Sequence, residues 1–186
     1  MTKRSLKTKA LWLLSSLLFI VLFWVIWIKF HSGAPETYLI PKDYSGIITV
    51  VYGEDCGIET PVENGRRILE IPDSGILIIR AEQEGGRIDH EYYFVNQNKE
   101  RVKVAPYENH YDGTVSIPGI KFRGSGVISG AMPDGSSSSE SPFAIRYSDL
   151  VVYQSTLKEN VDYNESFRQM EDLVGECRKQ QQQQQY

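Results

Sequence analysis

Short runs of β-branched and aromatic residues, each closed by a turn-forming sequence, fill the chain from Thr37 to residue 156. Such runs favour β-strands, and their close spacing leaves no room for long helices between them. The turn signals are strong, because Asn64-Gly65 accepts positive φ angles at low cost and Pro72 opens a Pro-Asp-Ser-Gly reversal. We predict up to ten strands, at residues 37–40, 47–52, 66–71, 76–81, 91–95, 101–104, 113–117, 126–129, 143–147 and 150–153.

Strands of this length and spacing indicate a mainly β fold, and we expect an antiparallel β-sandwich over residues 37–156. The turn over residues 41–46 predicts that the first two strands form a hairpin. Residues 63–77 predict a second hairpin by the same reasoning. The run at residues 47–52 is richer in Ile and Val than strict alternation gives.

The pattern changes to that of a helix after residue 156. Apolar residues recur there at three- and four-residue steps, which places them on one helical face, namely Phe167, Met170, Leu173, Val174 and Cys177. We expect a short C-terminal helix over residues 157–178, with Asn164 as its N-cap. This apolar stripe predicts packing on the sandwich, and partner binding is the alternative. The glutamine run predicts a disordered tail over residues 179–186.

The segment from residue 10 to residue 28 contains no charged residue. As a helix it would span about 28 Å, close to the ~30 Å hydrocarbon core of a bilayer. A cleaved signal peptide is the alternative, but its apolar region runs only about 7 to 15 residues, and Pro35 directly follows the best cleavage sequence. We therefore expect one transmembrane signal-anchor helix over residues 10–28 that contacts the lipid bilayer, followed by a linker over residues 29–36.

Basic residues at the extreme N-terminus predict the orientation of this helix. Segment 1–9 holds four basic residues and no acid. Because positive charges stay on the cytoplasmic side, we expect a single-pass cell-membrane protein with its N-terminus in the cytoplasm and its C-terminal domain outside. The remainder of the chain has 16 basic residues (20 − 4) against 24 acidic ones, which argues against nucleic-acid binding.

Both cysteines, Cys56 and Cys177, fall in the part of the chain that we place outside the cytoplasm. An oxidising compartment and an even count favour a disulfide between them, and two unpaired thiols are the alternative. Two cysteines alone cannot supply the four ligands of a structural zinc site. We predict no metal and no cofactor.

Few residues suit catalysis. His31 lies beside the predicted membrane segment, which leaves His90 and His110 as bases or ligands. With Glu91 they would make an envelope hydrolase or a metal-dependent enzyme if the fold brought them together, but nothing in their spacing requires this. We therefore predict no catalytic residue, and we favour a binding or structural module of the cell envelope over the enzyme.

One loop gathers residues that suit contact with a partner, namely Tyr107, Asn109, His110 and Tyr111. Tyrosine-rich loops on β-sandwiches are common contact surfaces. The partner we expect is another envelope protein or a glycan. Alternatively, these rings cover the end of the core.

Three segments carry a resemblance to a known family. Residues 38–53 match the pattern YLIPxxYxGxxxVxYG, residues 63–77 match ENGRxxxxIPxSGIL, and residues 89–94 match DxEYYF. Over residues 35–104 the chain resembles DUF6843, a family of small exported or membrane-anchored bacterial domains of unknown function. That resemblance implies an exported β-domain and supplies no catalytic residues. Residues 63–77 are also similar, more weakly, to prealbumin-like and carboxypeptidase-regulatory-like sandwiches.

Overall fold

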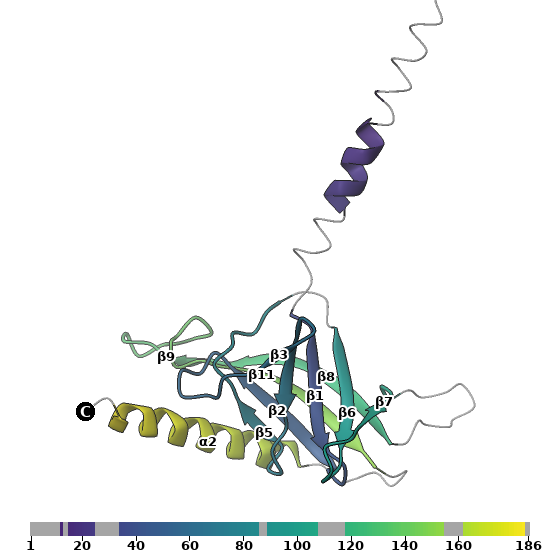
Figure 1. The fold of residues 1–186 in the computed structure, drawn as a ribbon. Helices are drawn as coiled ribbons and strands as arrows, with labels where there is room; N and C mark the ends of the chain where they lie inside the picture. The colour runs from purple at the N-terminus through teal and green to yellow at the C-terminus, as the bar shows by residue number, and fades with distance from the viewer. Residues whose placement is uncertain are drawn as a thin grey trace, which may run out of the picture. The chain divides into compact units, whose positions relative to one another are not determined.

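The structure, a computed structural model, describes residues 12, 15–24, 34–85, 89–107, 118–154 and 162–184. The chain divides into two units, and each is described by itself. The smaller unit contains a short helix near the N-terminus, and the larger is a β-rich domain with one C-terminal helix (Figure 1).

The helix near the N-terminus covers residues 15–24, and Trp12 is also helical. A helix of this length rises only ~15 Å, about half of a bilayer's hydrocarbon core. Among the residues that the structure describes, no helix combines the length and the apolar character needed to cross a membrane. The prediction of a transmembrane helix over residues 10–28 is therefore wrong. The rest of that span lies outside the described residues.

The first sheet of the β-rich domain has five strands, with β1 (Glu36–Pro41) at its centre. β1 pairs in parallel with β4 (Arg66–Glu70) on one side and with β6 (His90–Val95) on the other. The edge strands are antiparallel to their neighbours, since β3 (Val62–Glu63) pairs with β4 and β7 (Arg101–Val104) pairs with β6. The three central strands therefore have their carboxyl ends at the same edge of the sheet.

The second sheet has four strands in the order β5-β2-β11-β8. β11 (Ile145–Tyr153) pairs antiparallel with both β2 (Gly46–Tyr52) and β8 (Gly119–Ile128), whereas β5 (Ile76–Ile78) pairs in parallel with β2. Both sheets thus mix strand directions. The prediction of a mainly β fold with a C-terminal helix is right, but that of an antiparallel sandwich is wrong.

Two short turns carry the chain from one sheet to the other. The segment after β1 leads into β2, and the segment after β4 leads into β5, so each turn links strands of different sheets. The two hairpins predicted around these turns are therefore wrong. The Asn-Gly turn does close a hairpin, between β3 and β4, with φ angles of 51° at Asn64 and 76° at Gly65. A separate two-stranded ribbon is formed by β9 (Gly130–Ala131) and β10 (Ser137–Ser138).

The main core lies between the two sheets and follows the period of two along the strands. β6 and β11 contribute alternate residues in the same way as β1 and β2, whose members are Tyr38, Ile40, Ile48, Val50 and Tyr52. β2 is also buried on its other face, where Val51 contacts the C-terminal helix. Burial on both faces explains why the sequence of β2 does not alternate strictly. The fully or nearly buried members include Tyr38, Ile40, Ile48, Val50, Leu69, Ile79, Leu150 and Val152.

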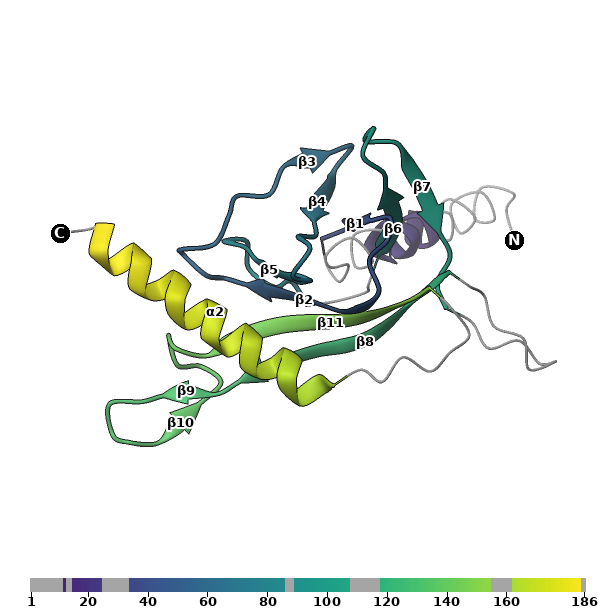
Figure 2. The ribbon, with the colours of Figure 1, turned by 90° about the horizontal axis from the view of Figure 1, so that it is seen from below.

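The C-terminal helix, α2 (Tyr163–Gln184), lies along the outer face of the second sheet, so the domain has three layers (Figure 2). Met170 and Val174 are buried against this sheet, which confirms that the apolar stripe packs on the β-domain. The helix starts at Tyr163 rather than at residue 157, and its cap is Asp162 rather than the predicted Asn164. The Asp162 carboxylate accepts the N–H groups of Asn164 and Glu165 at 2.9 and 3.2 Å.

Helix α2 also ends later than predicted. It continues through Gln184, so the disorder predicted from residue 179 is wrong for residues 179–184. Glutamine is a good helix former, and the run extends a helix that its preceding turns already anchor.

A disulfide and an ion pair hold the later turns of α2 to the β-domain. Cys56 and Cys177 form the disulfide that the sequence favours, with their Cα atoms 5.6 Å apart. Beside it, the Arg178 guanidinium donates to both carboxylate oxygens of the buried Glu54 at 2.6 and 2.8 Å. Arg178 also donates to the carbonyl of Ala144 at 3.2 Å.

Candidate functional site

Two residues of the predicted catalytic alternative, His90 and Glu91, are neighbours on β6 and point to opposite faces of the sheet. His90 faces the space between the sheets, where its ring lies 5.1 Å from that of Tyr38. Glu91 lies on the other face and receives hydrogen bonds from Lys103 at 2.9 Å and Tyr93 at 3.2 Å. His110 lies outside the described residues. His90 and Glu91 therefore do not form one site.

His90 belongs to a buried polar network centred on Glu36, at the amino end of β1. One Glu36 carboxylate oxygen lies 3.3 Å from His90 Nε2 and accepts the O–H groups of Tyr38 and Tyr52 at 3.0 and 3.1 Å. The other accepts Arg67 Nη1 at 3.0 Å. Because Tyr52 lies on the second sheet, this network ties the two sheets together.

The protonation states in the Glu36 network follow from its burial and its donors. Burial works to raise the pKa of Glu36, but the hydrogen bond and charge of His90, with the O–H groups of Tyr38 and Tyr52, lower it below the usual value. Burial and the nearby Glu36 charge raise the pKa of Tyr92 to about 12, and they also raise that of Tyr52. The carboxylate is thus ionised and the phenols stay protonated, which suits a structural role.

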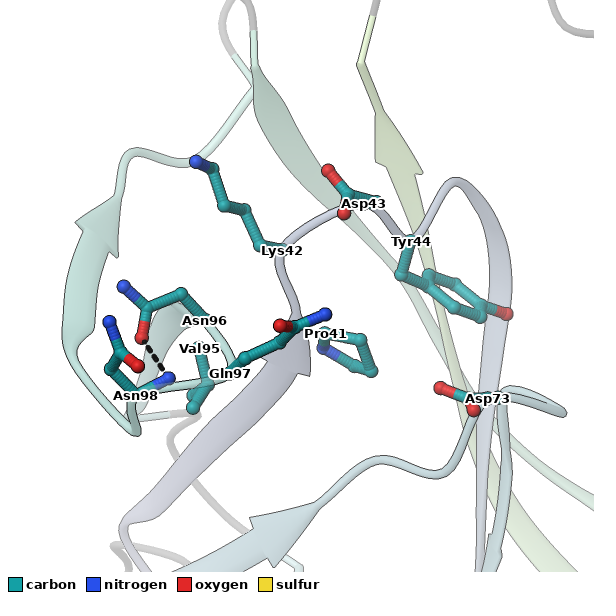
Figure 3. A pocket seen from close by; sticks show the side chains of 9 residues that line it. All are labelled: Pro41, Lys42, Asp43, Tyr44, Asp73, Val95, Asn96, Gln97 and Asn98. Atoms are coloured by element: carbon teal, nitrogen blue, oxygen red, sulfur yellow. Dashed lines mark hydrogen bonds between the residues drawn. The ribbon is translucent and has the colours of Figure 1, made fainter.

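An open hollow lies at the opposite end of β1, where the carboxyl ends of β1 and β6 adjoin. We call it the β1–β6 hollow, and its volume is about 780 Å³. Ligand sites in proteins commonly measure about 300–1,000 Å³. Its lining residues, shown in Figure 3, are Pro41, Lys42, Asp43, Tyr44, Asp73, Val95, Asn96, Gln97 and Asn98.

Backbone hydrogen bonds fix the turn on the β1 side of the hollow. The N–H of Lys42 donates to the carbonyl of Val95 at 3.0 Å, and the N–H of Tyr44 donates to that of Pro41 at 2.9 Å. The Gln154 amide donates to the carbonyls of Lys42 and Tyr44 at 2.9 and 3.0 Å. This turn is therefore held from both sheets.

The turn on the β6 side is organised by Asn96. Its side-chain oxygen accepts the N–H groups of Asn98 and Glu100 at 2.9 and 3.0 Å, and its amide nitrogen donates to the Glu100 carboxylate at 2.7 Å. Lys99 completes the turn in a left-handed conformation, with φ of 62°. The Asn96 side chain therefore stabilises the turn, and the side chains of Gln97 and Asn98 are exposed to solvent.

Five polar side chains around the β1–β6 hollow make no hydrogen bond or ion pair to any residue that the structure describes, namely Lys42, Asp43, Asp73, Gln97 and Asn98. All five are exposed. Figure 3 shows that they come from three separate segments and surround the hollow from different sides. They present donors and acceptors to solvent, which a bound molecule can use.

A second hollow of about 390 Å³ adjoins the first and shares Pro41, Val95, Asn96 and Gln97 with it. Its other lining residues are Leu39, Glu70, Ile71, Lys99 and Arg101. Arg101 is held by Glu63, whose carboxylate accepts two hydrogen bonds at 2.7 and 3.2 Å. Because they share these residues, the two hollows form one concave surface that is larger than the first hollow.

A smaller hollow of about 240 Å³ lies at the start of α2, and some of its lining side chains contact other residues. Arg123 lies 3.9 Å above the ring of Tyr163, and the Thr49 hydroxyl donates to Asp149 at 2.8 Å. Burial raises the pKa of Asp149. Because its two charged side chains, Arg123 and Asp149, already have partners, this hollow is a weaker candidate than the β1–β6 hollow.

The predicted contact loop lies mostly outside the described residues, which include only Tyr107 of its four residues. The Tyr107 ring packs against that of Tyr153, with centroids 4.7 Å apart. A role for Asn109, His110 and Tyr111 in contact with a partner stays a prediction.

No group of three or more His, Cys, Asp or Glu side chains within the described ranges is placed to hold a metal ion.

Sequence reasoning missed the residues of the β1–β6 hollow. The signal was present, since polar residues directly follow the strands that end at Pro41 and Val95. The expectation of antiparallel hairpins hid it, because antiparallel neighbours would place these two strand ends at opposite edges of a sheet. The parallel pairing of β1 with β6 brings them together.

Comparisons with known proteins bear on the fold and on the family. A sequence model described as a family of unknown function, DUF6843, matches residues 32–161. Among solved structures, the chain is similar to one described as a putative lipoprotein from Bacillus anthracis, with 20% identity and a TM-score of 0.54. That similarity covers 78% of this chain and 95% of the other, and at this identity it shows a shared fold alone.

No curated protein matches the chain. The weaker similarity to prealbumin-like and carboxypeptidase-regulatory-like sandwiches is not confirmed by these comparisons.

Proposed function

Since the chain belongs to the DUF6843 family, whose function is unknown, we propose that it is a non-catalytic binding module that works outside the cytoplasm. Its ligand site is the β1–β6 hollow. The observation that carries this proposal is the set of five polar side chains that surround the hollow with no partner in the described structure.

The fixed turns around the hollow support binding. Exposed polar side chains are common on any surface, but these five stand on turns that hydrogen bonds fix, and the turn of Lys42 and Asp43 is held from both sheets. A ligand that binds such turns does not have to order them first, which lowers the entropic cost of binding. The polar character of the rim favours a polar ligand.

The disulfide supports a location outside the cytoplasm. Structural disulfides persist in oxidising compartments and are rare in the cytosol, and Cys56–Cys177 joins segments 121 residues apart in sequence. The similar fold of a protein described as a lipoprotein is in keeping with this location.

The surroundings of His90 support a non-catalytic role. Its ring contacts Glu36 and lies among aromatic rings, with Phe122 at 5.1 Å and Tyr92 at 6.1 Å between centroids. A catalytic base needs contact with a substrate proton, and the His90 side chain is only 10% exposed. The envelope hydrolase is therefore the less favoured function.

Hydrogen–deuterium exchange of the full chain tests the proposed function. The chain is mixed with soluble fragments of an enzymatically digested cell envelope, and we expect slower exchange at residues 42–44 and 95–99. A triple variant, Asp43→Ala with Gln97→Ala and Asn98→Ala, should lose this protection. No protection of these segments by any fraction would contradict the proposal.

Thiol labelling in intact cells tests the location separately. Cys56 and Cys177 should resist alkylation until a reductant is added, because both are in the disulfide. Two thiols that react without a reductant in protein from its native compartment would place the domain in a reducing environment.

A further inference from the structure

We infer that the ligand of the β1–β6 hollow is an uncharged saccharide chain, and that it extends from this hollow into the adjoining one. This inference rests on the proposed function, because it names the class of ligand for the same site. It follows from the hydrogen-bonding groups, the charge balance and the apolar lining residues of the site, and from the second hollow that adjoins it.

The hydrogen-bonding groups of the hollow match hydroxyls. Asp43 and Asp73 only accept hydrogen bonds, Lys42 only donates them, and the amides of Gln97 and Asn98 do both. A hydroxyl group both donates and accepts, so a ligand with several hydroxyls can satisfy every one of these side chains. Ligands with only donors or only acceptors would leave part of the rim without a partner.

The charge balance disfavours a strongly charged ligand. Three acidic side chains line the two hollows, and three basic ones line them as well. Their formal charges cancel, so neither a polyanion nor a polycation gains a net electrostatic attraction. The lining residues concerned are Asp43, Glu70 and Asp73, and Lys42, Lys99 and Arg101.

The hollow also has an apolar component that suits the C–H face of a sugar ring. Pro41 and Val95 are the apolar residues among the four that both hollows share. Tyr44 offers its ring rather than its hydroxyl, because the hydroxyl donates to the carbonyl of Ile47. Burial raises the pKa of Tyr44 to about 12, so this donor persists at physiological pH.

The continuity of the two hollows sets the length of the ligand. They share four residues around the carboxyl ends of β1 and β6, so a chain bound in the first can continue into the second. An oligosaccharide gains contacts as it lengthens, whereas a monosaccharide fills only part of the site. We therefore expect a tetrasaccharide to bind more tightly than its monosaccharide.

Calorimetric titration of the full chain tests this inference with defined probes. Chitotetraose and maltotetraose are the neutral saccharides, and tripolyphosphate, spermine and tetraalanine represent an anion, a cation and a peptide. We expect at least one saccharide to bind with a dissociation constant of about 1 mM or tighter. The three other probes should show no binding under the same conditions.

Variants locate the binding within the hollow. Asp73→Ala and Gln97→Ala should each weaken saccharide binding roughly tenfold, since each removes a hydrogen bond to the ligand. Glu171→Ala, which removes an exposed carboxylate on α2, is the matched control and should bind as the wild type does.

Three results would overturn the inference. They are the absence of binding by both saccharides, saccharide binding that the hollow variants leave unchanged, and equally tight binding of tripolyphosphate, spermine or tetraalanine. If envelope fragments still protect residues 42–44 and 95–99 from exchange in that case, the binding module stands and only the saccharide is wrong.

Discussion

The two ends of β1 hold polar side chains in opposite states. At the amino end, Glu36 is 5% exposed and both of its carboxylate oxygens have partners, including Tyr38 and Tyr52. At the carboxyl end, the side chains of Lys42 and Asp43 are exposed and have no partner in the described structure. Within one strand, therefore, buried polar groups join the two sheets at one end, and free polar groups face solvent at the other.

This difference shows how stability and binding are separated along the strand. A buried charge is tolerated only when it is fully paired, so the groups around Glu36 cannot change partners without loss of stability. Exposed groups without partners contribute little to stability and are free to bind a ligand. The following predictions test this separation, and they start with the largest expected effect.

Glu36→Ala should cause the largest loss of stability. The variant leaves the side chains of Arg67 and His90, 12% and 10% exposed, without the carboxylate that they contact, and breaking a buried ion pair in this way costs about 3–5 kcal/mol. The free energy of unfolding in urea measures the loss. A change below about 1 kcal/mol, the value typical of an exposed pair, would show that the network does not join the sheets.

Gly75→Ala should cause the next largest loss, and it acts at the carboxyl end. Gly75 has φ of 77°, and a Cβ atom there would clash with the Tyr44 hydroxyl and lie 2.6 Å from the carbonyl oxygen of Ile47. We expect a loss of about 1–3 kcal/mol in urea unfolding, because both strain and a steric clash arise.

Gly65→Ala is the matched control for Gly75→Ala. Its φ of 76° is nearly the same, but nothing lies within 4 Å of the added Cβ. It should therefore show the backbone strain without the clash. Equal losses in the two variants would mean that the contact with Tyr44 does not matter.

The pH dependence of stability should reflect Glu36. Its pKa in the folded state lies below the ordinary value of 4.5, so its contribution is fully present above about pH 4.5 and is lost as the pH falls through the folded-state pKa. Glu36→Gln should therefore flatten the decline of unfolding free energy below pH 4.5. A decline as steep as that of the wild type would assign the acid sensitivity to other carboxyl groups.

Alanine variants of the hollow should have the smallest effect on stability. Asp43→Ala, Gln97→Ala and Asn98→Ala remove exposed side chains without partners, so each unfolding free energy should stay within about 0.5 kcal/mol of the wild type. Larger losses in urea unfolding would show that these side chains support the fold, and the separation between the two ends of β1 would fail.

Much of the secondary structure could be predicted from local sequence. The predicted strand at residues 101–104 has the same bounds as β7, and the predicted turn at Asn64-Gly65 is present, although the short strand β3 before it was not predicted. Strand lengths were harder, since β8 is ten residues long and the predicted strands at 143–147 and 150–153 are one strand, β11. The predicted strand at residues 113–117 lies outside the described residues.

The pairing of strands could not be predicted in the same way. A short turn such as that after Pro41 joins two strands equally well within one sheet or between two sheets. Long-range contacts decide the outcome, and here the pairing of β1 with β4 and β6 places β2 in the other sheet. The features that depend on parallel pairing, including the β1–β6 hollow, could therefore not be predicted from the sequence.

The Glu36 network was missed for a related reason. Glu36 falls in the predicted linker over residues 29–36, and nothing next to it in sequence marks it as buried. Its partners Tyr52, Arg67 and His90 come from three other strands. Only the assembled sheets bring these residues to one carboxylate.

Amide chemical shifts in an NMR titration with envelope fragments test the separation of the two ends most directly. The amide shifts should change at residues 42–44, 73–75 and 95–99, while those of Glu36, Arg67 and His90 should not change. Shift changes centred on Glu36 and His90, with none around the β1–β6 hollow, would contradict this separation.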